Sequence, residues 1–346
     1  MSVLSKAKVK KEKSTYKRGF LGTSRGTIYP KGRYGLELEV EGNNITAPSE
    51  EWHAVNDGSL RGQSTEYVLR SPIDFEPAKT AINNLFEQTL GRGMTYKDSN
   101  RTSFHVHLNV SDFNIIRVAN TITLYGIFEN LLVNWCGPYR VGNLFAQRLC
   151  DVKWSIKEIA TCLRDNSFRS FSNEVRYMGL NLASINKFGS LEFRTMRGIT
   201  NPQDGVTWLT LINKIYEASE RFQDPSEVVA DFSGQEQLMA RKVFGDELWN
   251  MLIKHTQEIG EDPVQHLWDG VRQVQEIAYA VNWQELRDDL KAPYIPNPFE
   301  KEKGFETPPR RLIDPDVWGR ADERAGIPPA RRGLRANLVN GRIVVE

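Results

Sequence analysis

Apolar and polar residues alternate strictly along several short segments of the chain, and residues 34–41 are the clearest example. The alternating positions hold aliphatic residues on one side and glutamates on the other: Leu36, Leu38 and Val40 against Glu37, Glu39 and Glu41. A period of two is that of a β-strand, so we expect the aliphatic side chains to face a core. Glutamate is a poor strand former, and like charges about 7 Å apart repel each other. The segment therefore predicts a strand whose acidic face is either hydrated or bound to divalent cations.

Further segments with the same period predict four more strands. They are residues 66–70, 103–110, 177–184 and 190–196. Their polar sides carry ionisable residues: Glu66, His105, His107, Glu192 and Arg194. The turn residues 186–189 predict that the last two strands form a β-hairpin. Residues 42–65 are polar and rich in turn residues, and the pattern predicts no strand there.

Apolar residues spaced three and four positions apart predict helices elsewhere. These segments are residues 77–90, 114–135, 152–163 and 201–222. Residues 114–135 are apolar almost throughout, so we expect this helix to pack across a sheet. Asn201 is expected to cap the helix that follows it, with Pro202 in the first turn. Residues 224–290 carry only helical patterns, interrupted at Asp224-Pro225, Gly245 and Asp262-Pro263, and predict a helical appendage or subdomain.

The two ends of the chain lack such periods. Residues 1–33 contain ten Lys or Arg against Glu12 alone and predict a mobile basic arm. Residues 291–340 are rich in Pro and Arg and predict an extended tail, after which Arg342–Glu346 could add an edge strand.

Composition narrows the class of protein. The 346 residues are 40% hydrophobic and 26% charged, as in an ordinary globular protein, and the formal net charge of +1 gives no electrostatic reason to expect nucleic acid as a partner. No apolar run reaches the roughly 18 to 20 residues of a membrane span, and no secretory signal is expected. The three cysteines form no C-x-x-C pair and predict reduced thiols in a cytoplasmic protein.

The polar sides of the predicted strands carry the candidate chemistry. Together they suggest one concave sheet with a charged inner face. Its carboxylates and imidazoles are the candidate metal ligands: Glu37, Glu39, Glu66, Glu192, His105 and His107. A set dominated by carboxylates suits Mg²⁺ or Mn²⁺ better than zinc. Arg194 and Arg176 would then bind a polyanion whose phosphate oxygens are bridged by the metals.

Known catalytic and nucleotide motifs are otherwise missing from the sequence. There is no G-x-x-x-x-G-K-[ST] loop and no G-x-S-x-G nucleophile elbow. If ATP is used, the sheet and its metals must therefore hold the phosphates.

The order of these motifs resembles that of the putative amidoligase family, within the superfamily of glutamine synthetase and glutamate–cysteine ligase. The resemblance covers residues 31–222 and has five pieces: Gly35–Glu39, Asp57–Leu60 with Glu66, His105–His107, Arg176–Leu182 and Leu191–Arg194. The chain would then divide into a basic arm (1–30), a catalytic domain (31–222), a helical appendage (223–290) and a Pro/Arg-rich tail (291–346).

The resemblance implies an α+β fold, with a curved antiparallel sheet and helices on its outer face. It also implies ATP-dependent joining of a carboxylate to an amine through an acyl phosphate, as in ligases of phage and bacterial genomes that act on a peptide or protein amine. Glu37, Glu39, Glu66, His105 and Glu192 would hold Mg²⁺. Arg194 would contact the transferred phosphate and Arg176 a second phosphate or the substrate. His107 would face either the nucleotide or the residues that surround the metal ligands.

Two alternatives stay open at this stage. The chain could be a non-catalytic structural or binding protein that keeps the ligase fold, because basic arms and Pro/Arg-rich tails are common in assemblies and oligomers. It could also be a different metal-dependent phosphoryl transferase or hydrolase that uses the same residues.

Overall fold

A computed structural model describes residues 32–90, 93–97, 99–165, 171, 173–290, 336–339 and 342–345. The predictions for the basic arm and for residues 291–335 lie outside the described residues. Contacts divide the chain into two units, residues 1–299 and 300–346, and each is described by itself.

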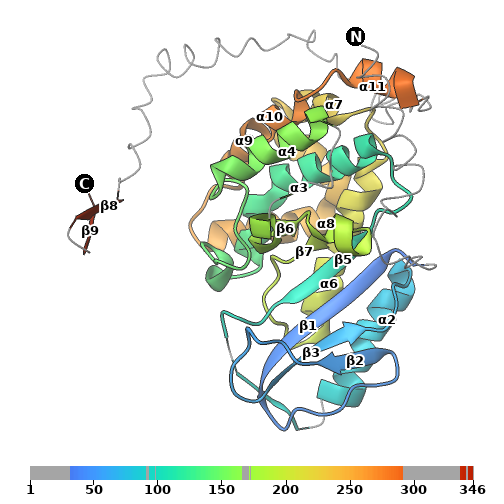
Figure 1. Ribbon diagram of the computed structural model, residues 1–346, viewed down its shortest axis with the longest axis vertical. Helices are drawn as coiled ribbons and strands as arrows, with labels where there is room; N and C mark the ends of the chain where they lie inside the picture. The colour runs from blue at the N-terminus through green and yellow to red at the C-terminus, as the bar shows by residue number, and fades with distance from the viewer. Residues whose placement is uncertain are drawn as a thin grey trace. The chain divides into compact units, whose positions relative to one another are not determined.

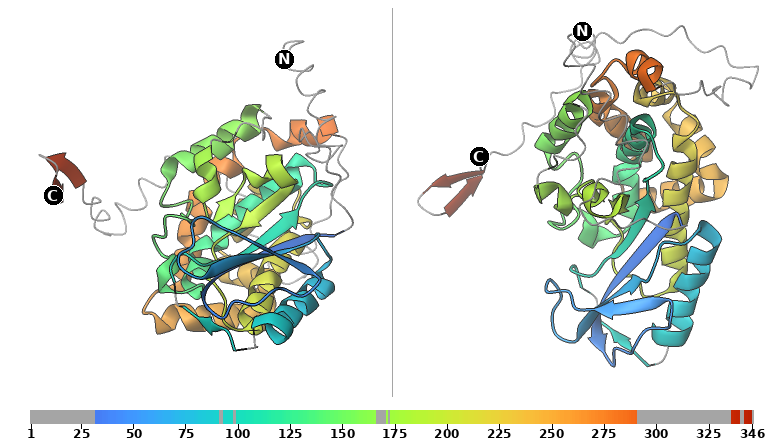
Figure 2. Two further views of the ribbon diagram at one scale, coloured as in Figure 1. Left: turned by 60° about the horizontal axis from the view of Figure 1, so that its bottom comes forward. Right: turned by 45° about the vertical axis from the view of Figure 1, so that its right-hand side comes forward.

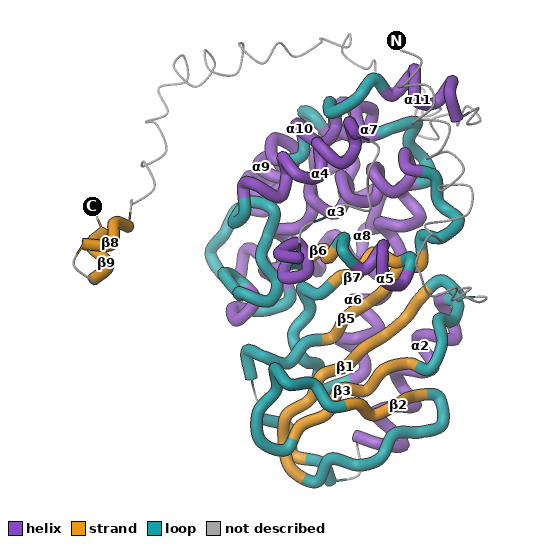
Figure 3. The backbone as a smooth tube through the Cα atoms, viewed as in Figure 1, coloured by secondary structure: helices purple, strands orange, loops and turns teal. Residues whose placement is uncertain are grey.

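The first unit combines a seven-stranded antiparallel sheet with several helices (Figures 1 and 3). The strand order is β2-β3-β1-β5-β7-β6, and β4 pairs with the end of β1. The strands are β1 Tyr34–Asn43, β2 Trp52–Val55, β3 Ser64–Leu69, β4 Thr95–Tyr96, β5 Phe104–Asn109, β6 Leu180–Asn181 and β7 Ser190–Phe193. The predicted mixed helix-and-sheet class, with an antiparallel sheet, is therefore confirmed.

The helices surround the chain's apolar core. They are α2 Phe75–Leu85, α3 Ile115–Trp135, α4 Lys153–Asp165, α5 Ser184–Phe188, α6 Pro202–Ser219, α7 Pro225–Phe232, α8 Glu236–Glu258, α9 Pro263–Gln273, α10 Gln275–Ala278 and α11 Trp283–Leu290. Three short turns are also helical: η1 Phe86–Leu90, η2 Pro138–Arg140 and η3 Asn173–Tyr177.

The sheet has one apolar and one polar face, as the alternating pattern predicts. The apolar side chains of β1 and β5 are buried in the core: Leu36, Leu38, Val40, Phe104, Val106 and Leu108. Helices α2 and α6 cover this face (Figure 2). At Gly205 of α6 the two helices and the sheet meet, because a Cβ there would lie 3.2 Å from Ile82 and 3.5 Å from Phe104. The polar face is therefore left to the loops that surround the sheet.

Helix α3 is buried on all sides. It contacts α6, α7, α8, α9 and α10, which explains why its sequence is apolar almost throughout. Its contact with α9 and with the residue that follows α9 is especially close at two glycines. A Cβ on Gly126 of α3 would lie 2.5 Å from Val274, just after α9, and one on Gly270 of α9 would lie 2.2 Å from the Ile127 carbonyl oxygen. The helices of residues 224–290 thus pack into the same hydrophobic core as the sheet.

Asparagine and aspartate side chains cap α6, α7 and α9, and the sequence predicts the first of these caps, at Asn201. The Asn201 side chain accepts a hydrogen bond from the Asp204 amide at 2.9 Å, and Pro202 begins α6. Asp224 and Asp262 cap α7 and α9 in the same way. Gly245 interrupts α8 with a φ of 78°, a conformation that glycine adopts readily.

Two local predictions were wrong. Strands β6 and β7 pair as expected, but the short helix α5, not a tight turn, connects them. This helix ends at Gly189 with a φ of 71°, the left-handed conformation that often terminates helices. Strand β2 lies within residues 42–65, where no strand was predicted. Its first residue, Trp52, is fully buried, so tertiary packing decides its conformation.

The second unit contains one described hairpin, in which β8 Ala336–Val339 pairs antiparallel with β9 Arg342–Val345. Among the described residues of the whole chain, no helix has both the length and the apolar composition needed to cross a membrane.

The α3–α9 contact leads to a stability prediction. Gly270→Ala should lower the free energy of unfolding by about 1–3 kcal/mol, because the new methyl group would overlap the backbone of α3. Urea denaturation followed by circular dichroism measures this change.

Gly58→Ala is the matched control, since a Cβ at Gly58 meets nothing within 4 Å. Its effect should stay within about 0.5 kcal/mol. Equal stability of the two variants would contradict the close approach of the helices.

Candidate metal and phosphate site

The register of the sheet aligns the polar residues in cross-strand pairs. On neighbouring strands the partners are Glu39 with Glu66, Glu37 with His105, and His107 with Glu192. Directly opposite residues on one face have Cβ atoms about 4.5–5.5 Å apart, so these side chains meet over β1, β3, β5 and β7. Residues separated by more than 150 positions in sequence thus come together through strand pairing alone.

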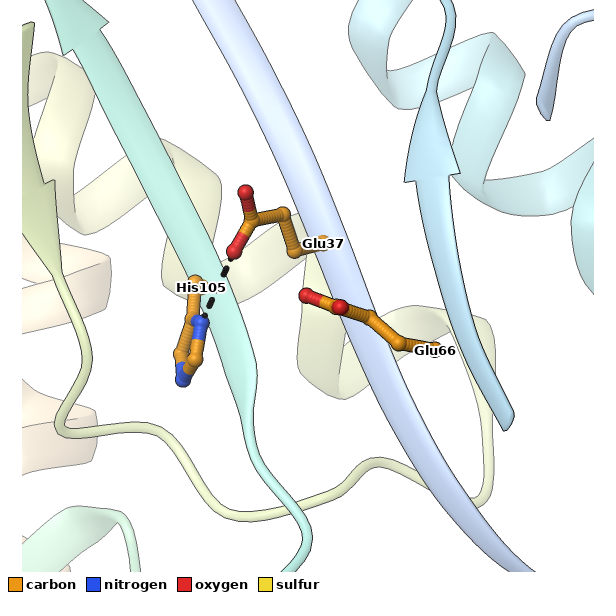
Figure 4. Close-up of side chains that lie close together, drawn as sticks. All are labelled: Glu37, Glu66 and His105. Atoms are coloured by element: carbon orange, nitrogen blue, oxygen red, sulfur yellow. Dashed lines mark hydrogen bonds and ion pairs between the residues drawn. The ribbon is translucent and has the colours of Figure 1, made fainter. Parts of the chain in front are cut away.

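The first candidate metal-binding group contains Glu37, Glu66 and His105. One ligand atom from each lies within 4.8 Å of the others. Figure 4 shows the Glu66 carboxylate directed toward Glu37, while His105 Nδ1 lies 3.1 Å from Glu37 Oε2. His105 is buried, and Glu37 is partly exposed. Two carboxylates and one imidazole form a donor set that fits Mg²⁺ or Mn²⁺.

The second group contains Glu37, His107 and Glu192, again with ligand atoms within 4.8 Å. His107 Nε2 lies 3.2 Å from Glu37 Oε1, and its Nδ1 lies 3.0 Å from the Ser190 hydroxyl. When Ser190 accepts from Nδ1–H, the Nε2 lone pair is free to bind a cation, as is usual for metal-ligating histidines. Asn181 donates to Glu192 Oε2 at 2.6 Å and fixes that carboxylate. His107, which the resemblance assigned to the nucleotide or to the surroundings of the metal ligands, thus completes a second donor set.

Gly35 makes room for His107. It occupies a polar-face position of β1 directly opposite His107, and a Cβ there would lie 3.3 Å from the His107 Cβ. A larger residue would push the imidazole away from Glu37.

Glu39 belongs to neither group. Its Oε2 accepts a hydrogen bond from the Ser103 hydroxyl, and that hydroxyl is also 2.6 Å from His105 Nε2. Ser103 therefore links Glu39 to the first group through His105. Glu39, which was predicted to be a metal ligand, thus lies beside the first group and contacts it through Ser103.

Burial and neighbouring charges shift the pKa values of these groups. Burial raises the pKa of Glu66 to about 8, and the nearby Glu37 and Glu39 add to this effect. Burial also raises the pKa of Glu37 and Glu192, but nearby positive groups outweigh it and hold both pKa values below the ordinary range. These groups are His107 and His105 at Glu37, and His107, Arg194 and His105 at Glu192. Burial lowers the pKa of His107, while Glu37 and Glu192 raise it more strongly.

Two arginines border the second group. Arg194 is paired with Glu192 through Nη1 and Oε1, and its guanidinium is partly exposed. Arg140 is buried and donates to the carbonyl oxygens of Arg194 and Thr195, each at 2.6 Å. Burial lowers the pKa of Arg140 to about 10. No motif or period in the sequence indicates Arg140, which ends the short helical turn η2.

Arg176 lies away from this arrangement. Its side chain is exposed, and its guanidinium lies 4.9 Å from the centre of the Tyr177 ring. The structure therefore brings together Glu37, Glu66, His105, His107, Glu192 and Arg194, and does not bring Arg176 into contact with them.

Two cavities lie beside the carboxylates. One, of about 260 Å³, is lined by Glu39, Glu41, Tyr96 and Thr102 among others. The other, of about 340 Å³, is lined by Glu41, Arg61, Lys97, Arg101 and Tyr139 among others. Both are near the lower end of the range for small-molecule sites.

No protein-family model matches this chain, and a search of curated protein sequences finds no match either. The function must therefore be argued from the site.

The charge coupling across the second group predicts a change in histidine titration. Glu37→Gln should lower the pKa of His107, because it removes one of the two carboxylates that favour the imidazolium while burial remains. Histidine-selective NMR titration of the metal-free protein measures this shift.

His255 serves as an internal reference, since its Nε2 contacts the Asn134 carbonyl oxygen at 2.9 Å and no carboxylate of the site. An unchanged His107 titration in the variant would show that Glu37 does not interact with this imidazole in solution.

Proposed function

We propose that this chain is an ATP-dependent carboxylate–amine ligase that forms an amide bond through an acyl phosphate. The observation that carries the proposal is the convergence of two cation-binding groups, which share Glu37, on one face of an antiparallel sheet beside Arg194. A sheet of the glutamine synthetase type, with helices on its outer face, is the fold that we propose for residues 31–222.

The residues present fit divalent cations. Glu37, Glu66 and His105 would hold one ion, and Glu37, His107 and Glu192 a second. The hydrogen bonds from Asn181 to Glu192 and between Ser190 and His107 fix the orientations of the ligands before an ion arrives. Bound Mg²⁺ would neutralise the charge of the ATP phosphates during transfer.

Arg194 supplies positive charge at the site, and Arg140 supports its backbone. Arg194 would contact the phosphoryl group as it moves from ATP to the substrate carboxylate. Arg140 acts as a positioning residue, because it holds the backbone of Arg194 and Thr195 through two hydrogen bonds.

The reaction has two steps. A carboxylate oxygen of one substrate forms a bond to the γ-phosphorus, and the bond to ADP breaks. The amine nitrogen of the other substrate then forms a bond to the acyl carbon, and inorganic phosphate leaves.

Metal binding and ADP formation test the proposal. Glu192→Gln should weaken Mn²⁺ binding by about 10-fold or more and lower Mg²⁺-dependent ADP release by about 100-fold or more, because it removes a ligand and a partner of Arg194. Calorimetry with Mn²⁺ measures the first effect, and a coupled ADP assay with a panel of carboxylates and amines measures the second.

Glu76→Gln is the control, since Glu76 lies on α2 and pairs only with Lys79 among the described residues. Wild-type protein that binds no Mn²⁺, with or without ATP, would contradict the proposal and favour a non-catalytic protein. Release of phosphate without an amide product would indicate a hydrolase instead.

A further inference from the structure

The hydroxyl group of Ser103 lies between the carboxylate of Glu39 and the imidazole of His105. It donates a hydrogen bond to Glu39 Oε2, and its oxygen lies 2.6 Å from His105 Nε2. The Glu39 amide also donates to the Ser103 carbonyl oxygen at 2.9 Å, so the backbone holds the two side chains together. Each of the three residues is exposed by 4% or less, and water therefore competes little for these hydrogen bonds.

The count of hydrogens in this arrangement decides the tautomer of His105. A serine hydroxyl has one hydrogen, and a carboxylate can only accept. Because that hydrogen goes to Glu39, the Ser103 oxygen must accept from the imidazole. The single hydrogen of the neutral ring then lies on Nε2, and Nδ1 carries a lone pair.

His105 Nδ1 faces the carboxylates of the site. It lies 3.1 Å from Glu37 Oε2 and 3.6 Å from Glu192 Oε1, and Figure 4 shows this nitrogen directed toward Glu37. A lone pair and two carboxylate oxygens repel each other at such distances unless a positive charge lies among them. Since Ser103 keeps the hydrogen of the neutral ring on the other nitrogen, that place is left to a metal ion.

His107 lacks the same support. Its Nδ1 lies 3.0 Å from the Ser190 hydroxyl, but no carboxylate accepts from that hydroxyl among the residues that the structure describes. The Ser190 hydroxyl can therefore either donate or accept, and it does not by itself decide the tautomer of His107. The two histidines of one strand thus differ in how firmly their hydrogens are placed.

We propose that Glu39 and Ser103 are positioning residues that keep the Nδ1 lone pair of His105 available to the cation of the first group. Glu39 then supports the metal site without being a ligand, in contrast to the role that the resemblance implies for it. This inference rests on the cation binding that the proposed function requires, and it assigns the coordinating nitrogen of His105.

Imidazole NMR of the full chain tests the placement of the hydrogen. Long-range proton–nitrogen correlation spectra of Mg²⁺-saturated wild-type protein should show the hydrogen of His105 on Nε2. Metal-free protein is recorded above the pH at which the imidazole signals stop changing, so that the rings are neutral, and the wild type should again carry the hydrogen on Nε2. Ser103→Ala should move it to Nδ1, because Nε2 loses its acceptor while Nδ1–H can donate to Glu37.

Glu39→Gln provides a second variant of nearly unchanged shape. Its amide can donate to the Ser103 oxygen and release the hydroxyl hydrogen toward Nε2, so the same move of the ring hydrogen to Nδ1 is expected. Ser190→Ala is the matched control, since it removes a serine hydroxyl from His107 and should leave the His105 signals unchanged.

Mn²⁺ calorimetry tests whether Glu39 and Ser103 act as a unit. Ser103→Ala and Glu39→Gln should each weaken Mn²⁺ binding about 10-fold or more, as is usual for partners of metal ligands. The double variant should stay within about 3-fold of either single variant, because both changes break the same set of hydrogen bonds. Glu41→Gln removes a carboxylate charge from the next polar position of β1 and should change the affinity by less than about 3-fold.

Three results would overturn the inference: a wild-type His105 hydrogen on Nδ1, identical His105 signals in the wild type and both variants, or losses of Mn²⁺ affinity that multiply in the double variant. Multiplying losses would make Glu39 a ligand in its own right. In each of these cases wild-type protein that binds Mn²⁺ leaves the ligase proposal standing. Wild-type protein that binds no Mn²⁺, with or without ATP, would overturn both, because no cation would then be held at Nδ1.

Discussion

The register of the antiparallel sheet is the constraint on which the whole site depends. Because side chains alternate between faces, a slip of one residue between β1 and β5 would move His105 and His107 into the core and Phe104, Val106 and Leu108 to the site. Burial of the apolar face beneath α2 and α6 therefore fixes the positions of the polar residues on the other face. The free energy that holds the ligands together comes from the core and not from attraction among the ligands themselves.

The sequence predicted the features that depend on local periodicity. The strands at β1, β3, β5 and β7, the buried helix α3 and the cap at Asn201 follow from spacing and from backbone hydrogen-bonding rules. It could not predict β2 or α5. Trp52 becomes part of a strand because its side chain is buried, and residues 184–188 turn as a helix because Gly189 can adopt a positive φ.

The same limit applies to the candidate site. Alternation indicated which residues share a face, so the meeting of Glu37, Glu66, His105 and Glu192 could be predicted. It does not determine which oxygens and nitrogens remain available after neighbouring hydroxyl and amide groups have bonded. The Ser103 hydroxyl occupies one carboxylate oxygen of Glu39, whereas Ser190 contacts His107 Nδ1 and leaves Nε2 available. Glu39 and His107 therefore differ in their availability as ligands, although both lie at alternating polar positions of a strand. Arg140 acts on the site through backbone carbonyl oxygens, which no sequence motif describes.

Glu37 is common to both candidate metal-binding groups, and this sharing has a consequence for how the site would fill. Its two carboxylate oxygens face different imidazoles: Oε2 lies near His105 and Oε1 near His107. An ion bound to one oxygen withdraws electron density from the other and places a positive charge close to the second position. Two cations would therefore occupy the site in sequence, the second more weakly than the first, unless a polyanion enters with it and offsets the repulsion. A centre of this kind would become complete only when a polyanion binds together with the second cation.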